Sequence, residues 1–184
     1  MRATNWDDLI HGKSLRRWLA TPAQDIHDIV RAASRILAVQ LCLLPSQLIV
    51  GRLLYSLNLY KPVHLHPLLE YTFPEVMLIV VSMIPLEELI FRVPLILPVR
   101  RYGLHWQTAV SVVLLAVLFG WAHGSLYNAL FQGVFGLLLG LLFLKAGGLT
   151  GQYVQAYFTT LGLHYLWDFI SIPIGYYLFW LRRR

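Results

Sequence analysis

The stretch Pro85-Leu86-Glu87-Glu88-Leu89-Ile90-Phe91-Arg92-Val93-Pro94 places two carboxylates and a guanidinium inside one of the most apolar parts of the chain. Ionisable groups at membrane depth cost at least ~2.5–3.5 kcal/mol each, and they persist where they face a protein interior, find partners and carry function. On a helix, Glu88 and Arg92 lie one turn apart with the acid first, which favours an ion pair. Glu87 lacks such a local partner, so this second carboxylate is a candidate functional group.

The composition is that of a membrane protein. Of the 184 residues, 58% are hydrophobic and 13% are charged, with a mean hydropathy of +0.61, whereas about 25% of the residues in a soluble domain are charged. Apolar runs long enough to span a bilayer recur, so we expect one domain with the lipid bilayer as its solvent. The net charge of +6 comes largely from the chain ends. Such an excess indicates membrane topology and attraction to lipid headgroups, and we expect no nucleic acid partner.

We therefore predict an all-α fold, a polytopic helical transmembrane bundle of about five to six membrane helices with an amphipathic N-terminal helix. Residues 1–35 are expected to form a basic amphipathic interfacial segment, and residues 36–184 the helical membrane domain. The expected spans are 29–57, 76–99, 107–121, 126–144 and 153–181. We expect the last span to break at Pro173 and Gly175 and to start a short return segment, because six elements place both basic chain ends in the cytoplasm.

Few polar residues lie on these spans, and they fall on three separate segments. His123 follows the third span, and His164 and Asp168 share one face of the last span because they are one helical turn apart. Gathered with Glu87 around one cavity, these groups supply a general base, a partner that orients it and donors for a developing oxyanion. The simplest reaction open to such a set is attack on an amide carbonyl by a water that Glu87 has activated.

Three motifs occur in order along the chain, and together they resemble a known family. The sequence contains Glu-Glu-x-x-x-Arg, Phe-x-x-x-His and His-x-x-x-Asp, formed by Glu87, Glu88 and Arg92, by Phe119 and His123, and by His164 and Asp168. This pattern resembles the CAAX protease and bacteriocin-processing (CPBP or Abi) family of glutamate-dependent intramembrane endopeptidases. The resemblance covers a core of about 73–173.

The resemblance implies a role for each motif residue. Glu87 would be the base that activates water, and His123 would share in polarising that water. Glu88 and Arg92 would brace the site, with Glu88 also able to hold a histidine. A purely structural ion pair between Glu88 and Arg92 remains the simpler interpretation of those two residues.

The third motif departs from part of the family. His164 and the residue at 168 would hold the oxyanion of the scissile carbonyl, but position 168 is Asn in the prenyl-protein endopeptidases and Asp here. An ionised Asp only accepts hydrogen bonds. Asp168 must then be protonated or serve to orient His164, and an interhelical hydrogen-bond pair without a catalytic role is the alternative.

The predicted function is hydrolysis of a peptide bond in a membrane-embedded or membrane-tethered peptide or protein, and the small size suggests a prokaryotic inner membrane. We expect no cofactor. Zinc is the less favoured alternative, since Glu87, His123, His164 and Asp168 are acceptable ligands but no His-Glu-x-x-His segment is present. Two other classes stay open, a noncatalytic scaffold or immunity protein and a proton-coupled transporter that uses the buried acids as a relay. The sequence leaves the oligomeric state undetermined.

Overall fold

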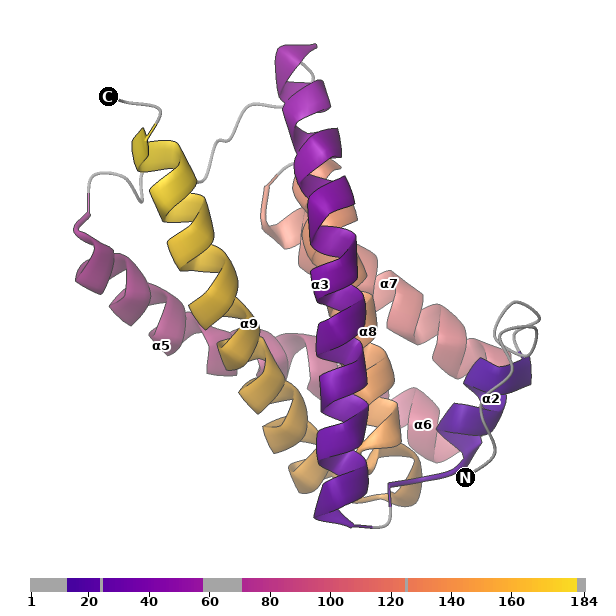
Figure 1. The fold of residues 1–184 in the computed structure, drawn as a ribbon. Helices are drawn as coiled ribbons and strands as arrows, with labels where there is room; N and C mark the ends of the chain where they lie inside the picture. Colours follow the sequence, from indigo (N-terminus) through magenta and orange to yellow (C-terminus); the bar gives the residue numbers. More distant parts are fainter. Residues whose placement is uncertain (1–12, 24, 58–70, 125, 182–184) are drawn as a thin grey trace.

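The computed structural model describes residues 13–23, 25–57, 71–124 and 126–181, and all regular structure within them is helical (Figure 1). This confirms the predicted all-α bundle. The elements are α2 (Lys13–Ala20), α3 (Ile26–Ser56), α5 (Phe73–Arg92), the 3-10 turn η1 (Val93–Leu95), α6 (Ile96–Tyr102), α7 (Trp106–Ala122), α8 (Leu126–Lys145), the 3-10 turn η2 (Gly148–Thr150) and α9 (Tyr153–Leu181).

Helix α8 is the centre of the bundle and contacts α7, α9, α3 and α2. Its glycines let α7 approach closely: a Cβ atom at Gly133 would lie 3.2 Å from the Ala116 carbonyl oxygen, and one at Gly140 would lie 2.9 Å from Val112. Small residues serve this purpose in membrane helices because packing, not the hydrophobic effect, holds such helices together. The α7–α8 pair therefore forms a rigid support for the remaining helices.

The amphipathic helix α2 is attached to the far end of α8 by one lysine. The Lys145 ammonium donates to the Trp18 carbonyl at 2.7 Å and to the Thr21 carbonyl, and it lies 5.2 Å from the centre of the Trp18 ring. A cation at the C-terminal end of a helix satisfies carbonyls that have no intrahelical donor. The expected division at residue 35 lies inside α3, so the interfacial segment and the first span share one continuous helix.

Within the described residues, two stretches are long and apolar enough to cross a bilayer, Ile26–Leu54 and Leu130–Thr150, and Trp106–Ala122 is a shorter apolar helix. Helices α5 and α9 are of similar length, but they carry the ionisable residues of the three motifs, Glu87, Glu88 and Arg92 on α5 and His164 and Asp168 on α9. Because intramembrane polar groups face the protein interior and mark functional sites, these two helices are where a site is expected.

Pro94 and Pro173 have different effects on the helices that contain them, and Pro173 contradicts the sequence prediction. The span expected at 76–99 ends at Arg92, turns through η1 at Pro94 and continues as the short helix α6. The break expected at Pro173 is absent, since α9 runs through Pro173 to Leu181, and the return segment based on that break is wrong. A proline removes one backbone hydrogen bond, whereas ending a helix there would leave several groups without partners in the hydrocarbon. The basic tail 182–184 lies outside the described residues.

Candidate active site

Helix α5 buries Glu88 and Arg92 inside the bundle and leaves Glu87 partly exposed. The helix begins with a capping box at Thr72, whose N–H donates to the Glu75 carboxylate at 2.7 Å. Among its buried residues, Ile84, Glu88 and Arg92 lie one helical turn apart and so face the bundle together. Glu87, one position from Glu88, is rotated by about 100° and reaches the rim of that face.

Glu88 is fully enclosed by partners. The Arg92 guanidinium donates to its two carboxylate oxygens, with Nε at 3.1 Å from Oε2 and a terminal nitrogen at 3.4 Å from Oε1. The Nδ1 atom of His164, which α9 contributes, lies 2.9 Å from Oε1. The side chains of Glu88 and Arg92 are 0% and 1% exposed, and that of His164 is 3% exposed. Such an enclosed carboxylate suits positioning rather than proton exchange with water.

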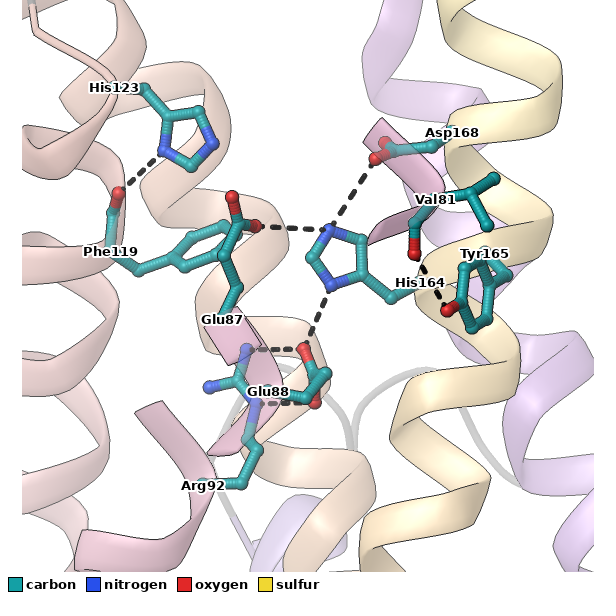
Figure 2. Close-up of polar contacts among 9 residues, drawn as sticks. All are labelled: Val81, Glu87, Glu88, Arg92, Phe119, His123, His164, Tyr165 and Asp168. Carbon is teal, nitrogen blue, oxygen red and sulfur yellow. Dashed lines mark hydrogen bonds and ion pairs between the residues drawn. The ribbon is translucent and has the colours of Figure 1, made fainter. Parts of the chain in front are cut away.

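Glu87 lies on the other side of the same imidazole. Its Oε2 is 3.8 Å from His164 Nε2, and its side chain is 26% exposed. Figure 2 shows the Glu87 carboxylate between His123 and His164. The predicted convergence of these groups from three separate helices is therefore present in the structure.

His164 lies at the centre of the cluster, with three carboxylates around its imidazole. Besides Glu88 and Glu87, Asp168 lies with Oδ2 at 3.7 Å from Nε2 and with 17% of its side chain exposed (Figure 2). One guanidinium cannot neutralise three carboxylates. In a medium of low dielectric constant, uncompensated charge is costly. The Nδ1 atom of His164 faces the Glu88 carboxylate, so that nitrogen carries a proton in this arrangement.

His123 is positioned by the end of α7 and the turn after it. Its Nδ1 lies 2.8 Å from the Phe119 carbonyl oxygen, an acceptor, so Nδ1 is the protonated nitrogen and Nε2 is the one available to the site. The Asn128 amide donates to the His123 carbonyl at 2.6 Å. The chain turns at Gly124, whose φ of 84° favours glycine.

The Phe119 ring packs against both imidazoles. Its centroid is 4.9 Å from that of His123 and 5.7 Å from that of His164. It also contacts Phe91 edge-on at 5.1 Å and lies 5.7 Å from the Arg92 guanidinium carbon. Phe119 is 0% exposed, so it excludes water from the Arg92 side of the cluster. The aromatic position of the second motif thus has a packing role that sequence spacing alone does not indicate.

Sequence analysis missed three further residues of α9 that contact α5. The Tyr157 hydroxyl donates to the Pro85 carbonyl at 3.0 Å, and the Tyr165 hydroxyl donates to the Val81 carbonyl at 2.9 Å. The buried Thr160 hydroxyl reaches both the Tyr157 carbonyl and the Glu88 carboxylate. A signal was available for two of them: Tyr157 and Thr160 precede His164 by seven and four residues and so share its helical stripe, whereas Tyr165 lies one position from His164.

The cluster offers a carboxylate with access to solvent, two oriented imidazoles and a braced ion pair, which are the components of general acid–base hydrolysis. Among the residues that the structure describes, no group of three or more His, Cys, Asp or Glu side chains could hold a metal ion. The expectation that the protein uses no cofactor stays a prediction.

Comparison with known families identifies the chain. The family described as type II CAAX prenyl endopeptidase Rce1-like matches residues 69–170, more than half of the chain, and this range contains every residue of the cluster. Comparison with curated proteins found no match, and comparison with solved structures found none either. The resemblance inferred from the three motifs is thereby confirmed, and the chain belongs to the Rce1-like family of CAAX-protease-type membrane endopeptidases.

Proposed function

We propose that this protein is a glutamic-type intramembrane endopeptidase, which cleaves a membrane-associated peptide or C-terminal protein segment with a water that Glu87 activates. One observation carries the proposal: adjacent carboxylates on one helix have opposite environments. Glu88 is 0% exposed between Arg92 and His164, whereas Glu87 is 26% exposed and its Oε2 lies 3.8 Å from Nε2 on the far side of the imidazole. A general base must exchange a proton with substrate water, and Glu87 has the access to do so.

Water binds between Glu87 and His123 in this proposal. The Nδ1 atom of His123 is paired with the Phe119 carbonyl at 2.8 Å, so Nε2 accepts a hydrogen bond from the water while the Glu87 carboxylate takes the proton. Two acceptors oriented toward one water align its remaining lone pair with the scissile carbonyl. His123 therefore polarises and orients the nucleophile, and Glu87 is the base.

The oxyanion is stabilised by His164 and Asp168. Glu88 at 2.9 Å keeps a proton on His164 Nδ1. In this proposal Nε2 and Asp168 also carry protons and act as the donors, while Glu87 is ionised. Two donors on one side of the site and an anionic base on the other fit the charge that develops as water adds to a carbonyl.

The bond changes follow from this arrangement. The water oxygen bonds to the carbonyl carbon as its proton passes to Glu87, and the carbonyl electrons move onto the oxygen beside His164 and Asp168. When the tetrahedral intermediate collapses, the C–N bond breaks and Glu87 returns its proton to the leaving nitrogen. The products are a carboxylic acid and an amine, and Glu87 is ionised again.

The direction of substrate approach follows from exposure. Glu87 and Asp168 are 26% and 17% exposed, whereas Arg92 at the opposite side of the cluster is 1% exposed and is covered by Phe119. The peptide therefore enters from the Glu87–Asp168 side. Because the site lies on helices of a membrane protein, a peptide anchored in or on the same bilayer is the fitting substrate, and a prokaryotic inner membrane the proposed location.

The test compares purified Glu87→Gln and His123→Ala with the wild-type protein in cleavage of membrane-anchored peptides. Loss of a positioned general base lowers the rate by about 10²–10⁴-fold. Glu75→Gln is the matched control, because it makes the same change on the same helix at an exposed position outside the site. Cleavage by Glu87→Gln at the wild-type rate would refute the proposal. In cells, the Glu87→Gln strain should accumulate an unprocessed membrane-anchored protein, which would identify the substrate.

A further inference from the structure

A proline breaks the hydrogen bonding of α5 immediately before the two glutamates. Pro85 has no N–H, so the carbonyl of Val81, one turn earlier, lacks the donor that every other residue in the helix interior would supply. In a membrane protein no bulk water is present to replace that donor. The Tyr165 hydroxyl, from α9, donates to the Val81 oxygen at 2.9 Å and satisfies it.

A second tyrosine contacts the same turn but in a different way. The Tyr157 hydroxyl donates to the carbonyl of Pro85 at 3.0 Å. That carbonyl lies within α5 and faces the amide of Leu89, one turn later, so Tyr157 supplies a second bond to an acceptor that the helix already satisfies. Tyr165 replaces a missing donor, whereas Tyr157 adds to an existing one.

The pair of helices joined in this way is the pair that forms the site. Helix α9 crosses α5 (Figure 1), and Tyr165 follows His164, whose imidazole contacts Glu88 at 2.9 Å and Glu87 at 3.8 Å. Figure 2 shows the Tyr165–Val81 bond beside this cluster. Pro85 thus converts a bond within α5 into a bond between α5 and α9, two residues before Glu87.

We propose that Tyr165 is a positioning residue of the active site, whose hydroxyl stands in for the amide that Pro85 lacks and so fixes the Glu87–Glu88 turn against His164. Tyr165 acts through the backbone and does not touch the substrate. An alanine at 85 would close the helix on itself and make this bond dispensable. The effect on catalysis rests on the proposed function, but the hydrogen bond itself does not.

The bond can be tested without any enzymatic activity. The sequence contains two Val-Ser pairs, Val81–Ser82 and Val110–Ser111, so labelling valine carbonyls with ¹³C and serine amides with ¹⁵N yields two cross-peaks. Tyr165→Phe should shift the Val81 carbonyl resonance and leave that of Val110 in place. The same substitution in Pro85→Ala should shift Val81 little, because the new amide of residue 85 donates to it. An unmoved Val81 resonance in Tyr165→Phe would overturn the proposal.

The role in positioning is tested by a double-mutant cycle on peptide cleavage. Tyr165→Phe should lower kcat about tenfold with little change in KM, since sub-ångström misplacement of reacting groups costs rate rather than binding. In the Pro85→Ala background the same change should cost at most about twofold. Tyr157→Phe, the matched control, should have a small effect in both backgrounds.

The possible results separate the two proposals. Equal losses from Tyr165→Phe in both backgrounds would refute the proline-dependent role, as would wild-type kcat in Tyr165→Phe. If Glu87→Gln cleaves normally, the proposed function fails, and the Val81 resonance still decides whether Tyr165 supplies the missing donor.

Discussion

Replacing Glu88 with glutamine tests whether this carboxylate stabilises the folded protein, as distinct from the catalytic role proposed for Glu87. The carboxylate accepts from Arg92 at 3.1 and 3.4 Å and from His164 Nδ1 at 2.9 Å, and all three side chains are nearly inaccessible. Glutamine keeps the shape but has one acceptor oxygen instead of two. One of the donors then loses its partner, and the guanidinium loses its counter-charge.

The expected magnitude follows from this geometry. Opposite charges separated by the 3.1 Å between Nε and Oε2 attract by about 5 kcal/mol at an effective dielectric constant of about 20. Removing one partner of a buried ion pair destabilises proteins by about 3–5 kcal/mol, because the other charge stays buried and uncompensated. We expect Glu88→Gln to lower the free energy of unfolding by about this amount.

The assay is reversible unfolding in mixed micelles with increasing sodium dodecyl sulfate, followed by helical circular dichroism. Glu88→Gln, Arg92→Met and the double variant form a cycle in which the double variant should lose less than the sum of the single losses, by about 0.5–3 kcal/mol. Glu75→Gln, an exposed site on the same helix, should be affected much less. A Glu88→Gln protein as stable as the wild type, or strictly additive losses, would refute the ion-pair reasoning.

Three other outcomes are expected. A Cβ atom at Gly136 would lie 2.8 Å from the Phe119 ring, so Gly136→Ala should displace that ring and lower peptide cleavage about tenfold; Gly162→Ala, where a Cβ meets nothing within 4 Å, should cleave normally. Hydrogen bonds from the Thr72 N–H and hydroxyl hold the pKa of Glu75 below its usual value. The cap of α5 should therefore be fully formed above the usual carboxyl pKa and lost as the pH falls through the lowered pKa of Glu75. At that acidic pH, amide hydrogen exchange in the first turn of α5 should be as fast in the wild type as in Glu75→Gln. Cleavage should persist in a metal chelator, and loss that added zinc reverses would favour the zinc alternative.

The sequence predicted the candidate site more completely than the fold. Glu88 and Arg92 pair as their spacing indicated, and Glu87, His164 and Asp168 meet although 76 residues separate Glu88 from His164. This worked because charged and polar groups are rare in apolar helices, so the few present must find one another. The catalytic roles assigned to these residues stay predictions.

Prolines were the least predictable feature. Pro94 ends a helix, Pro173 does not, and Pro85 is accommodated by a tyrosine from another helix. The chemistry of each residue is the same, so its local sequence cannot distinguish them. At Pro85, a residue of another helix donates to the freed carbonyl, and that contact exists only in the folded protein.

Composition and helical period are local properties of the chain, so they were enough to predict the membrane-embedded helical class, the motifs and the grouping of polar residues on three segments. The spacing of Glu88 and Arg92 predicted their pairing, but only the folded bundle shows that His164 completes the enclosure of Glu88 and that Glu87 keeps access to solvent. That difference arises because α9 crosses α5 on one side only, so the imidazole at 164 bonds to Glu88 and leaves Glu87 at the open rim.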